Sequence, residues 1–416
     1  MVSLLIIADD FTGALDTGVQ FATRGIATRV VADPDADPAF FADEVLVVDT
    51  ETRHLAPEDA RRTVAALTGR AVKAGVRFLY KKTDSALRGQ IGAELSALLT
   101  ASGEKQLPFL PAFPQTGRIT RGGIHYVEGV PVTESPFGAD PFEPVRRASV
   151  PELIGAQSSL PVHRFPPLKD PDPIPEDGGI LVFDASDDAD LESTGRRLFA
   201  GRSPRILAGC AGFAVFLPEL LHLKQSGAPD VPELDPRLLV VCGSVNPITL
   251  AQLDAAERAG FARLRLTPRQ KLEAGYWETE EGLRDLTAIE TMLAEHAHCI
   301  IESSDARGNQ LTAGYAAAPG LSLDGLRVRI AQSLGSLVGA IFSSQNLGTL
   351  LLTGGDTLLQ CMKAVGVREL IPVCELEKGV VLARFTCRGC TRFVITKSGG
   401  FGQETLFADL AGRMAR

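Results

Sequence analysis

The sequence lacks any long run of apolar residues. No stretch of its 416 residues approaches the ~20 consecutive apolar residues that a membrane-spanning helix requires. The first residues form a short apolar run, without a basic segment before it or a small-residue cleavage site after it, so we interpret this run as a strand rather than a secretory signal. We therefore expect a cytoplasmic protein that does not bind membranes.

An excess of positive charge is also absent. The 42 Lys and Arg residues are outnumbered by 51 Asp and Glu residues, and the formal net charge is −9. Proteins that bind nucleic acids or anionic membranes through a basic patch show the opposite balance. The charge pattern therefore argues against a nucleic-acid partner and favours a small-molecule ligand.

Cysteine is scarce and scattered. The seven cysteines are an odd number in a large chain, which fits reduced thiols better than a disulfide framework. Only Cys387 and Cys390 have the spacing of a metal or redox site, and a zinc site needs a second pair of ligands. We interpret this pair as structural.

Two glycine fingerprints are missing as well. The chain contains neither a Gly-x-x-x-x-Gly-Lys-Ser/Thr sequence nor a Gly-x-Gly-x-x-Gly sequence. The first absence excludes a standard P-loop, and the second argues against an NAD-dependent dehydrogenase. Any phosphate-binding site in this chain must be built from other turns.

The length of the chain favours two domains, because single hydrophobic cores stop growing at smaller sizes. The segment 226–236 is rich in turn-forming and polar residues and is the best linker. We therefore predict domains at residues 1–228 and 236–416. Both halves alternate short apolar runs with amphipathic stretches, which predicts an α/β fold of two α/β domains with mainly parallel sheets.

The alternation locates the expected elements. In the first half we predict strands at 4–8, 28–32, 45–49, 77–80, 180–183 and 205–207, and helices at 13–24, 57–74 and 211–223. In the second half we predict strands at 238–242, 262–266, 298–302, 350–352 and 392–396, and helices at 247–259 and 323–344. Residues 108–176 are rich in Pro, Gly and charge, which indicates an excursion from the sheet with a strand pair around 125–132.

Two acidic residues, Asp9 and Asp10, directly follow the first predicted strand and precede a helix. Ligands of open α/β sheets bind at the carboxyl ends of the strands, so this pair is placed to serve a ligand. Asp10 or Thr12 is equally suited to cap the helix. Position alone leaves both interpretations open.

Polar residues follow two further strands of the first half. The residues after the strand at 77–80 include Lys81, Lys82, Thr83, Asp84, Ser85 and Arg88. Such a set suits an anionic, hydroxylated ligand, because Lys supplies a point charge and Arg a fork for a carboxylate. A solvated loop with a capping serine is the alternative. Arg53 follows the strand at 45–49, and three converging strand ends predict a pocket.

Glycine-rich turns follow three predicted strands of the second half. These turns are Cys242-Gly243-Ser244, Thr353-Gly354-Gly355-Asp356-Thr357 and Lys397-Ser398-Gly399-Gly400-Phe401-Gly402. Glycine lets the backbone approach a phosphate, and the start of a following helix supplies amide donors. Each turn alone is a weak signal, because glycine-rich turns without a ligand are common.

Taken together, these segments resemble the four-carbon acid sugar kinase family, long known as a domain of unknown function and including D-threonate, D-erythronate and 3-oxo-tetronate kinases. The resemblance spans nearly the whole chain. Its five ordered motifs are Ala8-Asp-Asp-Phe-Thr-Gly-Ala14, Lys82-Thr-Asp-Ser-Ala-Leu-Arg-Gly89, Pro111-Ala-Phe-Pro114 with Gly117-Arg118, Gly354-Gly-Asp-Thr357, and Lys397-Ser-Gly-Gly-Phe-Gly402. One departure is Ala86, where relatives often carry Thr, so a hydroxyl expected near the acceptor pocket is missing.

The resemblance implies an ATP-dependent kinase whose amino-terminal domain holds the sugar acid, whose carboxy-terminal domain holds ATP, and whose active site is a cleft between the domains. The acceptor-site pattern falls on Asp10, Arg53, Lys82, Thr83, Asp84 and Ser85, to which we add the neighbouring Arg88. The nucleotide pattern falls on Ser244, Gly354, Gly355, Asp356, Thr357 and Gly400, to which we add Gly399.

Phosphoryl transfer asks the protein for positioning, charge neutralisation and a carboxylate that takes the proton of the acceptor hydroxyl. Asp10 is the first candidate for this base. Asp356 is the second, because it lies at a glycine-flanked helix start beside the predicted phosphate site. We expect Mg²⁺ to bridge the nucleotide phosphates through few carboxylates, and we assign no metal ligands.

A different class of function remains as the alternative, a non-catalytic sensor of sugar acids or nucleotides on the same fold. Such a sensor should carry a DNA-binding module or an effector domain, and the sequence shows neither. Because most soluble oligomers are symmetric homo-oligomers, we expect a homodimer.

Overall fold

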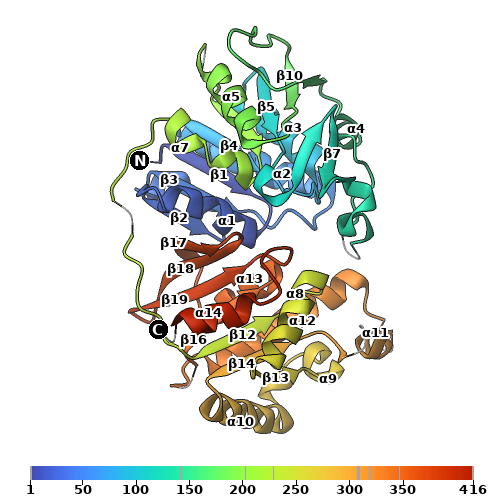
Figure 1. Ribbon diagram of the computed structural model, residues 1–416, viewed down its shortest axis with the longest axis vertical. Helices are drawn as coiled ribbons and strands as arrows, with labels where there is room; N and C mark the ends of the chain where they lie inside the picture. The colour runs from blue at the N-terminus through green and yellow to red at the C-terminus, as the bar shows by residue number, and fades with distance from the viewer. Residues whose placement is uncertain are drawn as a thin grey trace. The chain divides into compact units, whose positions relative to one another are not determined.

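The computed structural model describes residues 2–140, 143–201, 203–227, 229–306, 310–317, 320–345 and 347–414. The chain forms two compact units, Met1–Pro229 and Asp230–Arg416 (Figure 1). The division between them falls inside the turn-rich segment 226–236. Among the described residues, no helix combines the length and the apolar character needed to cross a membrane.

The first unit is built on a parallel sheet with the strand order β2-β3-β1-β4-β11-β5-β10-β9. The strands are β1 Leu4–Ala8, β2 Thr28–Val31, β3 Val45–Asp49, β4 Phe78–Lys82, β5 Gln106–Leu110, β9 Val162–Phe165, β10 Gly179–Phe183 and β11 Ile206–Gly209. The central strands are short apolar runs buried on both faces, as parallel sheets covered by helices require. The predicted α/β class with a mainly parallel sheet is confirmed here.

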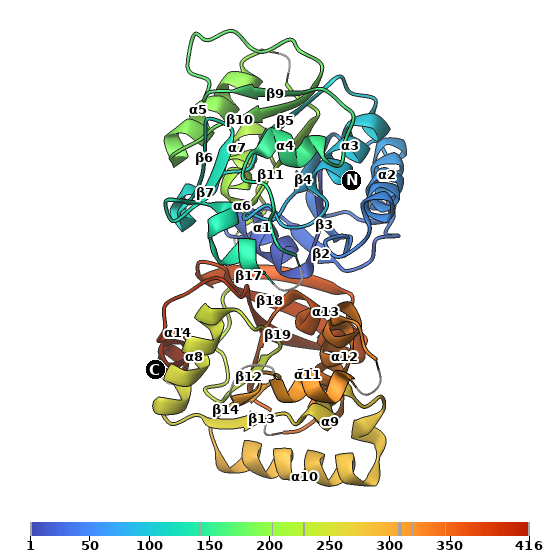
Figure 2. The ribbon, with the colours of Figure 1, turned by 90° about the vertical axis from the view of Figure 1, so that its right-hand side faces the viewer.

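Helices cover both faces of this sheet. They are α1 Phe11–Ala22, α2 Pro57–Lys73, α3 Ile91–Ser102, α4 Val150–Gly155, α5 Asp188–Phe199, α6 Ala211–Ala214 and α7 Leu217–Leu220. Helices α2 and α3 lie side by side, and their apolar residues share one core with alternate residues of β1 and β3 (Figure 2). The β1-α1-β2 and β3-α2-β4 connections run in opposite directions across the sheet, so right-handed crossovers place α1 on the other face.

A small antiparallel sheet is inserted between β5 and β9. It consists of β6 Arg118–Arg121, β7 Ile124–Val127 and β8 Val130–Pro131, and two short 3₁₀ helices, η3 Val132–Glu134 and η4 Pro136–Ala139, follow it. The predicted strand pair is present, with β6 as an additional strand. The predicted excursion over 108–176 is too long, because β9 returns to the main sheet and pairs with β10.

The single helix predicted at 211–223 is wrong. The structure has two short helices, α6 and α7, with Pro218 in the first turn of α7. Proline has no N–H to donate, and its ring clashes with the carbonyl group four residues earlier. The helix therefore ends after Ala214 and starts again at Leu217.

The second unit has a mainly parallel sheet with the order β13-β14-β12-β16-β19-β18-β17. Its strands are β12 Leu238–Cys242, β13 Ala262–Arg265, β14 His298–Glu302, β16 Thr349–Thr353, β17 Glu369–Glu377, β18 Val380–Cys387 and β19 Cys390–Lys397. The last two links of this order are antiparallel. Strands β17 and β18 are additions to the predicted set.

The helices of the second unit are α8 Pro247–Arg258, α9 Pro268–Leu272, α10 Glu280–Glu295, α11 Gln310–Ala317, α12 Leu323–Ile341, α13 Gly355–Ala364 and α14 Leu406–Met414. Helices α8 and α14 lie on one side of the sheet and α12 and α13 on the other (Figure 2). The core residues of α8 and α14 pack against alternate residues of β12, β16 and β19.

The Cys387–Cys390 pair closes a hairpin between β18 and β19, in which the two cysteines lie opposite each other. The two residues of the turn, Arg388 and Gly389, have φ angles of 50° and 76°. Two consecutive positive φ angles are typical of the tight hairpin turn that matches the twist of the strands. The spacing of this pair therefore has a local structural explanation.

Candidate functional site

Three strand ends of the first unit meet at one edge of its sheet. Ala8, the last residue of β1, pairs with Asp49 of β3 and with Lys82 of β4, so the three strands end level with one another. The residues that follow these strands therefore emerge together. This is the convergence that the sequence predicts.

Arg53 is the link between these strand ends. Its Nε donates to Asp9 Oδ2 over 2.8 Å, and its two terminal nitrogens donate to the two oxygens of Asp10 over 2.9 and 2.7 Å. A third carboxylate, that of Asp84, lies 3.6 Å away. Burial lowers the pKa of the Arg53 guanidinium, but the charges of Asp10 and Asp9 outweigh burial and hold the pKa well above its usual value.

Asp10 also caps helix α1. Its carboxylate accepts hydrogen bonds from the Gly13 amide at 3.0 Å and from the Thr12 hydroxyl at 2.8 Å. Of the two interpretations left open by the sequence, the helix cap is confirmed, and service to a ligand stays a prediction. Its four acceptor positions are filled by these two bonds and by Arg53.

The loop after β4 is held rigidly from several sides. Arg88 donates two hydrogen bonds of 3.0 Å to the two oxygens of Asp84. Burial raises the pKa of the Asp84 carboxyl, but the charges of Arg88 and Arg53 outweigh burial and hold the pKa well below its usual value. The Thr83 amide donates to the Gly209 carbonyl oxygen over 2.8 Å. The Thr83 hydroxyl is buried and has no hydrogen-bond partner among the described residues.

Lys82 places a positive charge in the centre of this cluster. Its side chain is buried, and its Nζ lies 2.7 Å from the point that a β-carbon on Gly13 would occupy. Within the described part of the chain, its amino group has no recorded carboxylate partner. Only glycine fits at position 13, because a side chain there would collide with both Asp10 and Lys82.

The neighbouring Lys81 does not face the cluster, contrary to the sequence-based prediction. The sequence predicts that β4 ends at residue 80 and that both lysines face the ligand. The strand in fact continues through Lys82, and side chains alternate between the two faces of a strand. Lys81 therefore points to the opposite face, where its amino group lies 3.3 Å from Glu94 of α3.

Residues of the inserted sheet complete the cluster and were missed by the site prediction. Arg118 of β6 donates to the Ser85 hydroxyl, and His125 of β7 lies 2.9 Å from the Ser85 carbonyl oxygen. The ring of Phe137 stacks against the guanidinium groups of both Arg118 and Arg88, at 5.2 Å in each case. Arg118 belongs to one of the five family motifs, so the sequence could have placed it in the site. His125 lies outside these motifs, and a lone histidine gives no signal of a site.

The side chain of Ala86 packs away from the charged cluster of Asp10, Arg53, Lys82 and Asp84. It is buried in a separate apolar cluster with Val127, Val132 and Val145. This packing favours a structural role for the side chain at 86, and the expectation of a missing acceptor-site hydroxyl stays a prediction. The residue at 86 packs the loop against the insertion.

In the second unit, the three predicted glycine-rich turns also emerge at one edge. Cys242 pairs with Thr353, and Thr353 pairs with Lys397, so β12, β16 and β19 end level. A β-carbon on Gly243 would collide with Thr357 Oγ1, and one on Gly399 would lie 2.8 Å from Ser244 Oγ. The glycines therefore allow three turns to form one close cradle.

Helix α13 begins inside this cradle. Gly354, its N-cap, has a φ angle of 104°, and no side chain of the described residues caps the helix. The first amide groups of an uncapped helix have no acceptor within the helix, so those of Gly355 and Asp356 suit an anion. Asp356 pairs with Arg327 of α12 at 2.5 Å, a contact that no sequence signal indicated.

Hydrogen bonds from two buried side chains, Lys397 and Thr249, hold the turn after β19 in place. The buried amino group of Lys397 donates to the carbonyl oxygens of Ser398 and Gly399 over 3.0 and 3.2 Å. The Thr249 hydroxyl donates to the same Gly399 carbonyl over 2.7 Å. Gly400 follows directly and is half-buried.

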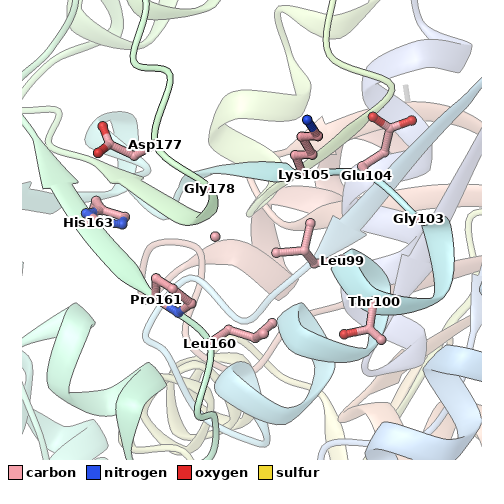
Figure 3. Close-up of a pocket in the computed structure, with 11 residues that line it drawn as sticks. Leu99, Thr100, Gly103, Glu104, Lys105, Leu160, Pro161, His163, Asp177 and Gly178 are labelled. Atoms are coloured by element: carbon pink, nitrogen blue, oxygen red, sulfur yellow. The ribbon is translucent and has the colours of Figure 1, made fainter.

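A hollow of about 580 Å³ lies elsewhere in the first unit (Figure 3). It is lined by the end of α3 and by residues just before and at the starts of β9 and β10, among them Leu99, Leu160, His163 and Asp177. This is the amino-terminal edge of the sheet, opposite the strand ends described above. It contains none of the predicted site residues.

Comparison with known families divides the chain in the same way. The family described as a sugar-binding N-terminal domain matches residues 4–217, and the family described as a nucleotide-binding C-terminal domain matches residues 239–407. The charged cluster of Asp10, Arg53, Lys82 and Asp84 lies in the first match. The glycine cradle lies in the second.

Several relatives match nearly the whole chain. A D-threonate kinase of Salmonella typhimurium is 31% identical over 98% of this chain and 97% of its own length. A D-erythronate kinase of Heliobacterium modesticaldum is 29% identical over 90% of this chain and 89% of its own length. A solved structure of a Salmonella typhimurium protein, 21% identical, has a TM-score of 0.76 over 99% of both chains and supports the fold.

Proposed function

Because the chain belongs to the four-carbon acid sugar kinase family, we propose that it transfers the γ-phosphoryl group of ATP to a hydroxyl group, the 4-hydroxyl, of a sugar acid such as D-threonate, D-erythronate or 3-oxo-tetronate. One observation carries this proposal. A cluster of cations and carboxylates lies in the unit that matches a sugar-binding domain, and a glycine cradle lies in the unit that matches a nucleotide-binding domain.

We assign the acid to the cluster formed by Asp10, Arg53, Lys82, Thr83, Asp84, Ser85 and Arg88. Lys82 is our choice for the cation that receives the carboxylate of the acid. Arg53 and Arg88 already hold protein carboxylates, whereas Lys82 has no recorded carboxylate partner in the described part of the chain. The bound carboxylate would offset a buried charge.

We assign the phosphates of ATP to the cradle formed by Ser244, Gly354, Gly355, Asp356, Thr357, Gly399 and Gly400. The fit of a phosphate rests on the glycines, since side chains at Gly243 or Gly399 would fill the space between the turns. It also rests on the uncapped start of α13, whose amides favour an anion. ATP supplies the transferred phosphoryl group when bound.

We assign proton acceptance from the acceptor hydroxyl to Asp10, with Asp356 as the second candidate. All four acceptor positions of Asp10 are occupied, so an incoming hydroxyl must replace one existing bond. The Thr12 hydroxyl is the partner most easily displaced, because it is neutral and can turn away. Arg53 then holds the carboxylate in place during the transfer.

A Mg²⁺ ion is expected with the nucleotide. Among the described residues, no cluster of three metal-ligating side chains is found. A Mg²⁺ ion carried by phosphates needs no such cluster, because it keeps several waters and uses few protein carboxylates. Asp356 is the carboxylate that the cradle offers to it.

The test is an assay of ADP release with ATP, Mg²⁺ and a panel of threonate, erythronate, 3-oxo-tetronate and 4-hydroxythreonine. We expect release of ADP with at least one acid, matched by an equal amount of a phosphate monoester detected by ³¹P NMR. Binding of an acid and of ATP without any ADP above background would instead identify a non-catalytic sensor. Lys82→Ala should raise the KM of the acid far more than that of ATP, and Lys105→Ala, an exposed lysine at the opposite edge of the sheet, is the matched control.

A further inference from the structure

Beneath the acceptor cluster, Lys81 and Glu94 form a fully buried ion pair. Lys81 Nζ lies 3.3 Å from Glu94 Oε2, and both side chains are 0% exposed. A buried ion pair is weak evidence for stability, because removing two charges from water costs about as much as their attraction returns. An apolar pair of the same volume would fill this space, so the charges require another explanation.

The bonds of Lys81 connect two strand ends. Its amino group donates to the carbonyl oxygen of Ile7 in β1 over 3.1 Å and to that of Lys82 in β4 over 2.8 Å. These carbonyl groups lie next to the positions from which Asp9 and the loop after β4 emerge. Lys81 therefore sets the spacing between those two strand ends.

The bonds of Glu94 reach the third strand end. Its carboxylate accepts a hydrogen bond from the hydroxyl of Thr52, the residue before Arg53. The neighbouring Thr50 hydroxyl donates to the carbonyl oxygen of Ala8 over 2.7 Å, which ties the same segment to the end of β1. The two hydroxyls lie 2.9 Å apart, but each has already donated its single proton, so the connection runs through the short backbone between Thr50 and Thr52. One connected network thus ties together the backbones that carry Asp9, Arg53 and Lys82.

The electrostatics agree with this arrangement. Burial raises the pKa of the Glu94 carboxyl, while the charge of Lys81 opposes that rise. The Asp9 carboxyl, which is equally buried, has a lowered pKa because Arg53, Lys82 and Lys81 together outweigh its burial. The charge of Lys81 thus helps to lower the pKa of Asp9, although the Lys81 side chain lies on the opposite face of β4 from the cluster.

We propose that Lys81 and Glu94 are a positioning pair for the acceptor site, which sets the places of Arg53 and Lys82 without touching the substrate. This inference rests on the function proposed above and assigns a further role to residues outside its binding set. A positioning role predicts that the pair affects binding of the acid and leaves binding of the nucleotide unchanged.

The experiment replaces both charges at once. In Lys81→Met/Glu94→Leu, apolar groups of similar volume fill the site, so no uncompensated charge remains buried. We expect the double variant to fold with a lowered thermal midpoint, because the buried Ile7 and Lys82 carbonyl groups and the Thr52 hydroxyl each lose a partner. Glu94→Gln alone should also unfold at a lower temperature, because it isolates the Lys81 charge. The KM of the acid should rise by roughly tenfold to a hundredfold, as expected for groups displaced by about 1 Å, and the KM of ATP should stay unchanged.

The matched control is Arg29→Met/Asp43→Leu. This pair, 2.8 Å apart, lies in the same unit near the starts of β2 and β3, at the edge of the sheet opposite the acceptor cluster. Both KM values should stay unchanged. If the first double variant fails to fold, Thr52→Val serves instead, because it removes only the hydroxyl group that bonds Glu94.

Two results would overturn the inference. One is a folded Lys81→Met/Glu94→Leu or Thr52→Val variant with the wild-type KM for the acid, and the other is an equal rise in both KM values. Failure of the proposed function has a different signature, namely no ADP release by the wild-type protein. In that case, amide hydrogen exchange of residues 50–55 and 82–88 tests the positioning role of Lys81 and Glu94. Faster exchange in the double variant than in the wild type supports this role, and unchanged exchange overturns it.

Discussion

Arg53 holds the carboxylate of Asp10 through two parallel hydrogen bonds, with N–O distances of 2.7 and 2.9 Å. The two residues are 43 positions apart and follow different strands, β3 and β1. Paired guanidinium–carboxylate bonds fix both distance and orientation, which a single ammonium group cannot do. This contact therefore sets the geometry of the acceptor cluster.

Arg53→Ala should lower both the affinity for the acid and the free energy of unfolding of the first unit. It leaves the buried Asp9 without its main partner, and loss of one member of a buried pair typically costs about 3–5 kcal/mol. Urea unfolding measures this loss. Arg53→Lys should recover part of the stability and little of the acid binding, because the fork is lost. In both variants the KM of the acid should rise far more than that of ATP, and equal increases would contradict the assignment of Arg53.

Asp10→Asn tests the proposed base. Asparagine keeps an oxygen that caps α1, so the fold should persist, but it cannot accept a proton at neutral pH. Loss of a general base typically lowers kcat by roughly 10²–10⁴-fold. Binding of ADP, measured by calorimetry, should stay near normal. A variant that turns over at close to the wild-type rate would remove Asp10 from this role and leave Asp356 as the candidate.

Gly243→Ala tests the cradle of the second unit. The new methyl group would collide with the Thr357 hydroxyl and push two turns apart. We expect weaker nucleotide binding, seen as a higher KM for ATP and a higher dissociation constant for ADP, with acid binding preserved. Gly412→Ala in α14 is the control, because nothing lies within 4 Å of the point that its new methyl group would occupy. Wild-type affinity in Gly243→Ala would argue against a phosphate in the cradle.

His125 should make the stability of the first unit depend on pH. Burial lowers its pKa from the usual value near 6.5 to about 4, and the charge of Arg118 acts in the same direction. The unfolded chain therefore binds a proton on His125 more readily than the folded chain does. As a result, the contribution of the neutral His125 to the free energy of unfolding is fully present above pH ~6.5 and is lost as the pH falls towards ~4. The full effect is at most roughly 3 kcal/mol.

The measurement is the free energy of unfolding of the wild type and of His125→Gln between pH 4 and 7. The wild type should lose stability relative to the variant as the pH falls. Asp84 adds a separate loss at lower pH, because its pKa is depressed in the folded state and its contribution disappears as the pH falls through that depressed value. Parallel curves for the two proteins would show that His125 does not titrate differently on folding.

Ala86→Thr should change stability and not selectivity. Its side chain faces a tight apolar cluster, and overpacking of such a cluster typically costs about 1–3 kcal/mol. The ratio of kcat/KM values among the acids of the panel should remain that of the wild type. A changed ratio would place position 86 in the acceptor pocket after all.

The sequence predicted most strands of both sheets, because these strands are short apolar runs between turn-forming residues. β1, β3, β12 and β14 coincide with the predicted ranges. The prediction failed where a local signal was overridden. One apparent helix was divided by Pro218. The β17–β18 hairpin at the antiparallel edge of the second sheet was not predicted, although residues 380–383 form a short apolar run like those of the other strands.

The two lysines at the end of β4 show that the sequence could not predict which face of a strand a side chain occupies. The sequence shows that Lys81 and Lys82 follow an apolar run, but the direction of each side chain depends on where the strand ends. Because the strand continues for two more residues than predicted, one lysine enters the core beside Glu94 and the other enters the cluster. A shift of one residue would exchange their roles.

The sequence by itself determined that polar and glycine-rich segments directly follow buried apolar runs, and hence that they gather at the carboxyl edges of two parallel sheets. Only the tertiary structure decided which of these residues meet. Arg53 with Asp10, His125 with Ser85, and Arg327 with Asp356 are separated by 43, 40 and 29 positions. Such pairs depend on strand order, on register and on the packing of an insertion, and no local pattern in the chain encodes these relations.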